Sequence, residues 1–372
     1  MTQTAVRSGI IGTGFMGRMH LNAVRANGGE VAAVAGSSAT RGEEARRAFG
    51  VSRASSPEEL INSPDVDLVH ICTPNQTHYE LALAAIAAGK HVICEKPLAV
   101  TVEQARELAA AAATADVVNA VPFVYRYYPT VREAQERLRS SGERVWLLHG
   151  HYLQDWLSSR TDYNWRVAAS ASGESRAFAD IGVHWCDLAE FMSGHRISRL
   201  SARMSRLHET RETEEGEVAV QTEDGVTLMF ETDRGATGSL VVSQGTPGRK
   251  NRLWLSVDGE RASYSFDQEN PNELWVGGRE QNAIVPKGYE TTSFDSVSQY
   301  VSAPSGHPQG YQDCFNGLVS DVFAAIAGED RPGMPTFADG ARAAEITATV
   351  VRAAKGESWV DVPSAVSSGA AS

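Results

Sequence analysis

Short apolar runs alternate with amphipathic stretches along the first third of the chain. The apolar runs have the length and composition of buried strands, and they cover residues 6–11, 31–35, 68–72, 91–94 and 117–121. Helical patterns lie between them at residues 15–26, 41–49 and 76–88, and capping sequences begin further helices at Ser56 and Thr101. Repeated strand-helix alternation requires parallel strand pairing with helices on both faces of the sheet. We therefore predict a doubly wound parallel α/β sheet in residues 1–123.

The pattern changes after residue 123. An aromatic connector at residues 122–129 leads into a helix that ends at Arg139 and a strand at residues 145–152. From residue 197 onward, β-type runs are separated by turn sequences such as Asp258-Gly259, which indicate an antiparallel meander. Helical patterns return at residues 311–327 and 340–355. We predict that residues 124–363 form an α+β domain for substrate binding and dimerisation, with a large, mostly antiparallel, open-faced sheet, and that residues 364–372 form a disordered tail.

The open face of this sheet predicts self-association. Too few helices are available to cover both faces of the meander, so apolar sheet must be covered in another way. Pairing two sheets face to face by two-fold symmetry does this. We expect a homodimer or homotetramer through the C-terminal sheet.

Composition narrows the class of protein. A chain of 372 residues with 42% hydrophobic and 22% charged residues is typical of a globular protein of about two domains. Its formal net charge of −12 disfavours a nucleic acid partner. No segment has the length and hydropathy of a membrane span or signal peptide, so we expect a cytoplasmic protein. The cysteines are far apart and the histidines do not fall into a ligand spacing, so we expect reduced thiols and no metal site.

A glycine-rich turn follows the first predicted strand and precedes the first predicted helix. It is a GxGxxG sequence formed by Gly12, Thr13, Gly14, Phe15, Met16 and Gly17. In this context the glycines permit a tight turn and close approach of a pyrophosphate, and the helix N-terminus favours the anion. The turn therefore predicts a Rossmann dinucleotide-binding domain, with one NAD or NADP per chain.

The residue that normally selects between NAD and NADP is missing. An acidic side chain is expected about 20 residues after the turn, at the end of the second strand. Gly36, Ser37 and Ser38 stand there instead, with Arg41 nearby. Because no carboxylate repels a 2′-phosphate, and because Ser37, Ser38 or Arg41 could bind one, both cofactors remain open. Arg41 could equally be a solvated residue in the first turn of its helix.

Two strand tips carry polar groups. The strand at residues 91–94 ends in Glu95, Lys96 and Pro97, which cannot continue as buried sheet. Since ligands bind at the carboxyl ends of parallel strands, this tip is a candidate reaction centre, although a solvated Glu-Lys pair is the alternative. The strand at residues 68–72 exits into a polar loop at residues 73–78, which is placed to hold the riboses of a cofactor.

The order of these motifs resembles the Gfo/Idh/MocA family of NAD(P)-dependent sugar and cyclitol oxidoreductases. The resemblance rests on the glycine turn, on CTPNxTH at residues 72–78 and on AGKHVxxEKP at residues 88–97. It implies that the nicotinamide half of the cofactor is lined by Thr73, Asn75, His78 and Glu95. It also implies that Lys96 faces the substrate hydroxyl and contributes to the cofactor site. Gly36 is the departure from the family pattern, and it leaves the choice of cofactor in doubt.

A second signature of the family matches Asp180 and His184. Four residues apart on a helix, these side chains point to one side and can work as a pair. The resemblance implies that they join Lys96 in one catalytic constellation across the domain interface. Without it, a packed core histidine would be the ordinary interpretation of His184.

Further candidates for the substrate site follow from the same resemblance and from their chemistry. Flat aromatic rings beside hydrogen-bonding groups suit a sugar, which has apolar faces and a polar rim. The candidates are Tyr125, Arg126, Gln154, Trp165 and His307, together with Arg166, which we assign to the cofactor. Hinge or surface packing is the alternative for Tyr125, Arg126, Gln154 and Arg166, and a solvated loop position is the alternative for His307.

These residues predict reversible hydride transfer from a ring hydroxyl of a sugar, glycoside or cyclitol. The hydroxyl must lose its proton as hydride leaves, and histidine, with an ordinary pKa of about 6.5, is a better base at neutral pH than lysine at about 10.4. We therefore assign the base to His184, orientation of the base or of the substrate to Asp180, and stabilisation of the developing alkoxide to cationic Lys96. Lysine as the base remains open.

Two other classes of function remain open from sequence. One is a glycoside hydrolase, or a glycoside 3-dehydrogenase, that uses bound NAD for oxidation and elimination. The other is a sensor that binds sugar or nucleotide without turnover, against which the presence of Lys96, Asp180 and His184 together argues.

Overall fold

The computed structural model describes residues 6–164, 167, 173–214, 216–292 and 294–363, and it divides the chain into two compact units. The first unit comprises Met1–Tyr127 and Gly310–Ala341, and the second comprises Tyr128–Gln309 and Arg342–Ser372. The return of residues 310–341 to the first unit was not part of the predicted division at residue 123. Trp165, Arg166 and the predicted tail at 364–372 lie outside the described residues.

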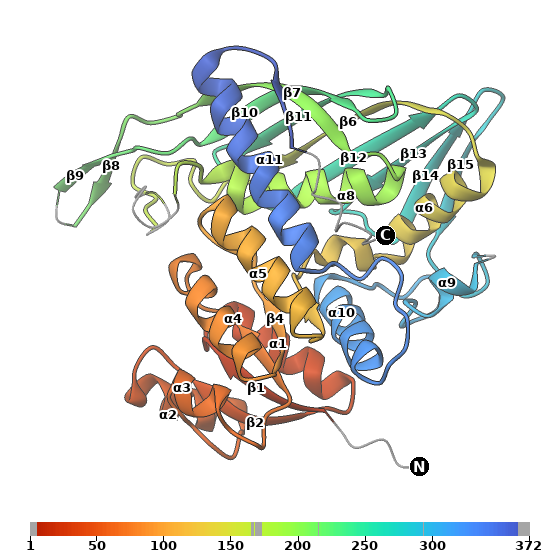
Figure 1. The fold of residues 1–372 in the computed structure, drawn as a ribbon. Helices are drawn as coiled ribbons and strands as arrows, with labels where there is room; N and C mark the ends of the chain where they lie inside the picture. Colours follow the sequence, from red (N-terminus) through yellow and green to blue (C-terminus); the bar gives the residue numbers. More distant parts are fainter. Residues whose placement is uncertain (1–5, 165–166, 168–172, 215, 293, 364–372) are drawn as a thin grey trace, which may run out of the picture. The chain divides into compact units, whose positions relative to one another are not determined.

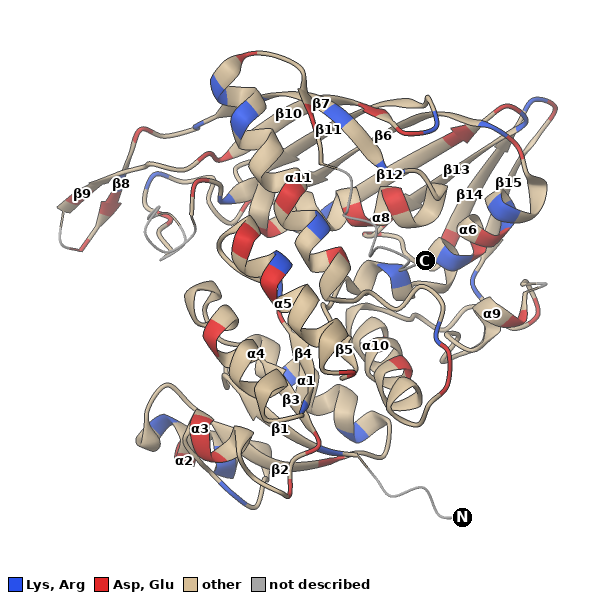
Figure 2. Cartoon of the chain, viewed as in Figure 1, with Lys and Arg blue, Asp and Glu red and all other residues tan. Residues whose placement is uncertain are grey.

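A five-stranded parallel sheet forms the centre of the first unit, as predicted (Figure 1). Its order is β2-β1-β3-β4-β5, and its strands are β1 (Arg7–Ile11), β2 (Glu30–Ala35), β3 (Leu68–Ile71), β4 (His91–Cys94) and β5 (Asn119–Ala120). β3 and β4 contain no charged residue (Figure 2), which suits strands that are buried on both faces. The chain reverses its direction of winding between β1 and β3, so the carboxyl ends of these strands border the ligand crevice of an open α/β sheet.

The helices of the first unit are α1 (Phe15–Ala26), α2 (Ala39–Phe49), α3 (Pro57–Ile61), α4 (His78–Ala87), α5 (Val102–Thr114) and α10 (Tyr311–Ile326), with short helices η1 (Asn75–Thr77) and η2 (Val124–Tyr127). Two of them, α3 and α5, begin at the caps that the sequence predicts. Ser56 and Glu59 form a reciprocal capping box at α3, and the Thr101 hydroxyl accepts the first-turn N–H of Gln104 at α5. The predicted helix at residues 76–88 is confirmed, with η1 as its first turn.

Hydrogen bonds join residues 310–341 to α1 and to the segment that follows β5 in the first unit. In α10, the Gln312 amide donates to the carbonyl of Met19 in α1, and Asn27 donates to the carbonyl of Asn316. The N–H of Val121 donates to the carbonyl of Pro335, which lies just before α11 (Phe337–Gly356). The division between the two units falls within α11.

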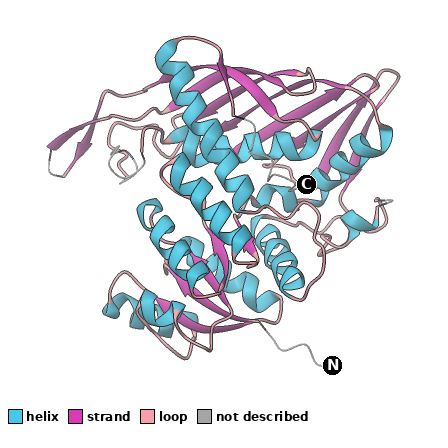
Figure 3. Cartoon of the chain, in the orientation of Figure 1, coloured by secondary structure: helices cyan, strands magenta, loops and turns pink. Residues whose placement is uncertain are grey.

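A nine-stranded sheet forms the second unit (Figure 3). Its order is β15-β14-β13-β12-β6-β11-β10-β7-β16, and its strands are β6 (Val145–Leu153), β7 (Ile197–Ser205), β10 (Gly225–Thr232), β11 (Thr237–Ser243), β12 (Arg252–Gly259), β13 (Ala262–Asp267), β14 (Glu273–Gly278), β15 (Asn282–Pro286) and β16 (Val360–Asp361). A separate hairpin contains β8 (Thr210–Thr213) and β9 (Gly216–Ala219). The sheet is mostly antiparallel, as predicted, but β6 lies at its centre and pairs in parallel with β11, so it is not a simple meander.

One face of this sheet is covered by helices. α6 (Pro129–Ser141) packs against β13 and β14, and α8 (Val183–Ser193) packs against β6 and β12 (Figure 1). A short α9 (Asp295–Ser298) packs against α6. Strand residues alternate between buried and exposed, as in β11, so the set that points away from α6 and α8 faces outward. No helix in the described residues is long and apolar enough to cross a membrane.

Candidate active site

The glycine turn between β1 and α1 has the geometry that a dinucleotide requires. Gly12 has a φ of +97°, and a Cβ there would lie 2.4 Å from the carbonyl oxygen of Cys72. A Cβ on Gly17 would lie 2.1 Å from the carbonyl oxygen of Gly12, so the third glycine lets the helix pack closely. At Gly14, by contrast, a Cβ would meet no atom within 4 Å. The turn is therefore tightly packed at Gly12 and Gly17 and open at Gly14, where a pyrophosphate would approach.

The N-terminus of α1 faces this open position. No side chain caps the helix, and its first turn contains no acidic residue. Phe15 is 68% exposed at the first helical position, with Met16 after it. Uncapped N–H groups and an unopposed helix dipole favour an anion, so the residues present fit the phosphates of a dinucleotide.

The end of β2 explains why an acidic residue is absent at Gly36. A Cβ on Gly36 would lie 2.5 Å from the backbone nitrogen of Gly42, so the start of α2 leaves no room for a side chain. The Ser38 hydroxyl accepts the N–H of Arg41 as the cap of α2, and exposed Arg41 pairs with Glu44 at 3.2 Å. Ser37 is exposed and follows Gly36 directly. Of the three candidates for a 2′-phosphate, Ser38 and Arg41 thus already have local partners.

His78 ties the loop after β3 to the turn after β4. Its buried ring places Nε2 at 2.8 Å from the carbonyl oxygen of Thr73 and Nδ1 at 2.8 Å from that of Pro97. Burial lowers the pKa of His78, and the two carbonyls act in the opposite direction. The Thr73 hydroxyl accepts from Thr77 at 2.7 Å, and Asn75 begins η1. His78 therefore fixes the loop, and contact of its ring with the cofactor stays a prediction.

Glu95 is buried at the tip of β4, and Lys96, which follows it, is half-buried. The carboxylate of Glu95 accepts the backbone N–H of Lys96 at 3.2 Å and lies 3.2 Å from Nε2 of His20. Burial raises the pKa of the Cys72 and Cys94 thiols well above the usual value, and the charge of Glu95 adds to this. His20 was not among the predicted site residues, although it lies on α1 three residues after Gly17 and contacts the tip of β4.

Asp180 and His184 lie in the second unit, where a π-helix precedes α8. The π-helix spans Phe178–Gly182, so Asp180 lies in a wider helical turn than predicted and His184 lies in the first turn of α8. Single π-helical turns are frequent at functional sites. A Cβ on Gly182 would lie 2.4 Å from the Phe178 ring, which explains the glycine. His184 is 6% exposed, and its ring centroid lies 6.5 Å from that of Tyr152 in β6.

Gln244, at the end of β11, is a partner of Asp180 that sequence reasoning missed. Its side chain is fully buried, and Nε2 donates to the Asp180 carboxylate at 2.7 Å. The two residues are 64 positions apart in the chain, and no local pattern links them. A hydrogen bond donated to a carboxylate favours the ionised form, so Gln244 helps to keep Asp180 an acceptor.

The other predicted substrate residues fall into different environments. Gln154 uses both ends of its amide, donating to Asn251 at 2.7 Å and accepting from the Trp156 indole at 2.8 Å. In the first unit, buried Arg126 pairs with Asp339 at 2.9 Å, and the buried Tyr125 ring lies 6.3 Å from that of Tyr311. His307 lies exposed in a loop. Substrate contact by these residues stays a prediction, and among the described residues no group of three His, Cys, Asp or Glu side chains is arranged to hold a metal.

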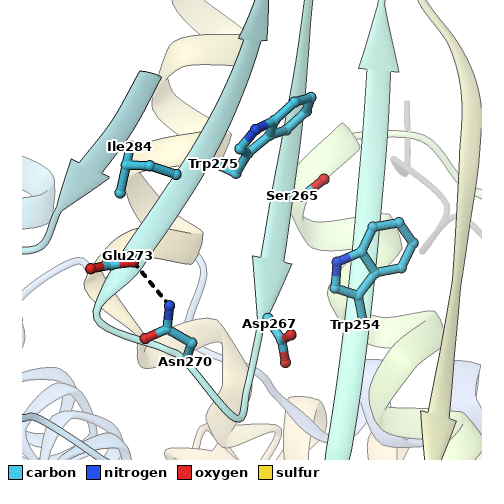
Figure 4. Close-up of a pocket in the computed structure, with 7 residues that line it drawn as sticks. All are labelled: Trp254, Ser265, Asp267, Asn270, Glu273, Trp275 and Ile284. Carbon is cyan, nitrogen blue, oxygen red and sulfur yellow. Dashed lines mark hydrogen bonds between the residues drawn. The ribbon is translucent and has the colours of Figure 1, made fainter. Parts of the chain in front are cut away.

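A hollow of about 350 Å³ lies on the outward face of the nine-stranded sheet (Figure 4). Residues of β12 to β15 and of the β13-β14 turn line it, namely Trp254, Ser265, Asp267, Asn270, Glu273, Trp275 and Ile284. Asn270 donates to Glu273 at 3.0 Å at its edge (Figure 4). Half-buried tryptophans and an exposed Ile284 on one sheet face form an apolar surface that a monomer would leave open to water.

Both parts of the chain match known protein families. Residues 6–123 match a family described as "Oxidoreductase family, NAD-binding Rossmann fold", and residues 131–265 match the "GFO/IDH/MocA C-terminal domain". A levoglucosan dehydrogenase from Pseudarthrobacter phenanthrenivorans is 32% identical over 95% of this chain and 97% of its own length. A 1,5-anhydro-D-fructose reductase from Ensifer adhaerens is 38% identical over 50% of this chain and 56% of its own length.

A solved structure resembles the whole chain. It is a levoglucosan dehydrogenase in complex with NADH and L-sorbose, with a TM-score of 0.91 and 31% identity over 97% of this chain and all of that one. The glycine turn, the strand tips and the second-unit pair thus occur in a chain that matches such proteins over nearly its full length. The protein belongs to the Gfo/Idh/MocA family of NAD-dependent oxidoreductases.

Proposed function

We propose that this protein is an NAD(P)-dependent dehydrogenase that oxidises a ring hydroxyl of a sugar, glycoside or cyclitol. The observation that carries the proposal is the glycine turn, which is open at Gly14 alone and faces the uncapped N-terminus of α1. Relatives named for the oxidation or reduction of levoglucosan, 1,5-anhydro-D-fructose and inositol support the substrate class.

The cofactor is assigned to the first unit. The proposed ligands are Gly12, Gly14, Phe15, Met16, Gly17, Ser37, Ser38, Arg41, Thr73, Asn75, His78, Glu95 and Lys96, with Arg166 from outside the described residues. NADH in the solved relative supports NAD. The exposed Ser37 leaves the 2′-hydroxyl without an acidic partner, so we propose that selection against NADP is weak.

The chemical roles are divided among three residues. When bound, the nicotinamide supplies the hydride acceptor or donor. We propose that His184 takes the proton of the substrate hydroxyl, that Asp180 orients the imidazole or the substrate, and that Lys96 stabilises the developing alkoxide as a cation. Gln244 supports the carboxylate form of Asp180 through its 2.7 Å hydrogen bond.

Absorbance of the reduced cofactor tests this function directly. A panel of sugars, anhydrosugars and cyclitols is incubated with NAD or NADP, and stoichiometric formation of NAD(P)H identifies the dehydrogenase and its substrate. Turnover of a chromogenic glycoside without net NAD(P)H would instead identify a hydrolase. The absence of both signals would indicate a sensor. The named relatives are dehydrogenases and a reductase, so the comparisons do not favour these two alternatives.

We also propose that the outward face of the nine-stranded sheet binds a second copy of this chain. Its exposed or half-buried apolar residues are Met229, Val241, Trp254, Trp275 and Ile284. We expect at least a dimer by light scattering at micromolar concentration, and Ile284→Asp should weaken it by placing a charge on the apolar face. Val100→Asp, at an exposed apolar position of the first unit, is the matched control, and a wild-type monomer would contradict the proposal.

The four cysteines at 72, 94, 186 and 314 form no disulfide. Reduced, mostly buried thiols support our proposal that the enzyme works in the cytoplasm.

A further inference from the structure

A buried chain of hydrogen bonds runs beneath the glycine turn of the first unit. Nε2 of His20 lies 3.2 Å from the Glu95 carboxylate, Nδ1 of His20 lies 2.9 Å from Nδ1 of His70, and Nε2 of His70 lies 3.2 Å from the Ser8 hydroxyl. Ser8, His20 and His70 are 0% exposed and Glu95 is 6% exposed. The chain thus connects β1, β3 and the helix α1 to the tip of β4, and the Phe315 ring of α10 packs on His20 at 5.1 Å.

The donor and acceptor roles in this hydrogen-bond chain follow from the chemistry of its groups. Burial lowers the pKa of His70 well below its usual value, so His70 is neutral and has one N–H. If this N–H points to His20, the Ser8 hydroxyl donates to His70; if it points to Ser8, His20 donates to His70. In both arrangements the Glu95 carboxylate can only accept, so the Nε2–H of His20 donates a hydrogen bond to it.

The Glu95 carboxylate accepts from His20 Nε2–H and from the backbone N–H of Lys96. Glu95 has little exposed surface through which water could replace a lost donor. The contact with His20 thus helps to fix the position of the Glu95 carboxylate at the tip of β4.

The topology places this charge on the nicotinamide side of the sheet. The sheet order is β2-β1-β3-β4-β5, and the glycine turn follows β1. A dinucleotide that crosses the switch point between β1 and β3 has its adenosine on the β2 side and its nicotinamide on the side of β3 and β4. Glu95 lies at the carboxyl end of β4. An oxidised nicotinamide is cationic and a reduced one is neutral, so a carboxylate there favours the oxidised form.

We propose that His20 is a positioning residue that holds the Glu95 carboxylate in place, and that the charge at this position sets the relative affinity of the enzyme for NAD⁺ and NADH. The inference rests on the proposed function, because it needs a nicotinamide cofactor in this site. The alternative is that the chain only satisfies buried polar groups and stabilises the fold. That alternative predicts lower stability when His20 is replaced, but no selective change between the two cofactor forms.

The experiment measures dissociation constants for NAD⁺ and NADH separately, by calorimetry and by NADH fluorescence, without sugar. His20→Met removes the donor that holds the carboxylate, and it should raise the Kd for NAD⁺ relative to that for NADH on the order of tenfold. Glu95→Gln removes the charge and should shift the ratio in the same direction at least as far. His20→Gln has an amide N–H that replaces Nε2–H, and it should restore most of the wild-type ratio.

A double-mutant cycle separates action through Glu95 from a general effect of His20. In the Glu95→Gln background, His20→Met should leave the ratio nearly unchanged, because the charge that His20 positions is already absent. Ser8→Ala is the control for the far end of the hydrogen-bond chain, since it leaves the contact between His20 and Glu95 in place. It should leave the ratio of the two dissociation constants unchanged.

An unchanged ratio in folded Glu95→Gln would overturn the inference even if His20→Met does not fold. A shift in His20→Met that persists in full in the Glu95→Gln background would also overturn it, because His20 would then act by another route. Failure of the proposed function is a different result, since wild-type protein would then bind neither cofactor form or produce no NAD(P)H with any sugar.

Discussion

The two units build polar sites in different ways. In the first unit, the glycine turn offers backbone N–H groups and an open position at Gly14, all within six consecutive residues. In the second unit, Asp180 is held by Gln244, 64 residues away, and buried Asp224 lies between the guanidinium groups of Arg176 and Arg211. A backbone site depends on which side chains are missing, and a side-chain site depends on partners that the fold brings together. The backbone site can therefore lose its ligand while the fold persists. In the side-chain site, by contrast, loss of a polar group also lowers the stability of the fold.

The largest effect expected from this contrast is that of Gly14→Val on the cofactor. A branched side chain would occupy the space where the pyrophosphate approaches, yet it would touch no atom of the protein within 4 Å at its Cβ. We expect cofactor binding by calorimetry to fall below detection while the thermal unfolding midpoint stays near that of wild type. Unchanged binding by a folded Gly14→Val protein would remove the dinucleotide assignment.

In the second unit, by contrast, Asp224→Asn is expected to lower the stability of the fold. Asp224 is 3% exposed, and the substitution would remove the charge that pairs with both buried Arg176 and buried Arg211. Breaking a buried ion pair in this way costs about 3–5 kcal/mol of unfolding free energy, to be measured by denaturant titration. Asp258→Asn, at a half-buried strand position of the same sheet, is the control and should cost much less.

The pH dependence of stability sharpens this prediction. Burial acts to raise the pKa of Asp224, but the N–H of Leu207 and the two arginines outweigh it and lower the pKa below the ordinary value. A carboxyl whose folded pKa is lowered stabilises the fold above its unfolded pKa of about 3.9, and this contribution is lost as the pH falls through the folded pKa. The wild type should therefore lose stability below about pH 4 more steeply than Asp224→Asn.

The pH profile of the reaction is expected to distinguish the roles proposed for His184 and Lys96. His184→Ala should lower kcat on the order of 10²–10³-fold with little change in cofactor affinity, and should abolish the acidic limb of the rate profile, because the titrating base is gone. Lys96→Ala should cost a comparable factor as one lost alkoxide-stabilising donor, but should leave that limb in place. If the limb survives in the His184 variant and disappears in the Lys96 variant, the lysine is the base and the assignment is reversed.

The same contrast decides how much could be predicted from sequence. The glycine turn, the strand tips and the capped helices are local patterns, and the structure confirms the parallel sheet that they predict. The contact between His20 and Glu95 spans 75 residues, and the contact between Gln244 and Asp180 depends on the end of β11, so neither leaves a local signature. The parallel pairing of β6 with β11 and the return of residues 310–341 to the first unit were missed for a similar reason. An amphipathic helix or an alternating strand shows that it has a buried face, but not which element covers it.

The smallest effect is expected at Ser37, where the backbone site meets an exposed side chain. Gly36 leaves no room for the usual acid, because a Cβ there would lie 2.5 Å from Gly42, and Ser37 is the next position from which a carboxylate could reach the adenosine ribose. Ser37→Asp should repel a 2′-phosphate and raise the NAD-to-NADP ratio of kcat/KM by about tenfold, the effect of one exposed like charge. Thr40→Asp adds the same charge three residues further along the chain, at an exposed position in the first turn of α2, and it should shift the ratio less. If Ser37→Asp leaves the ratio unmoved, the adenosine ribose lies elsewhere; if both variants shift it equally, the effect reflects the net charge of the surface and not a contact at Ser37.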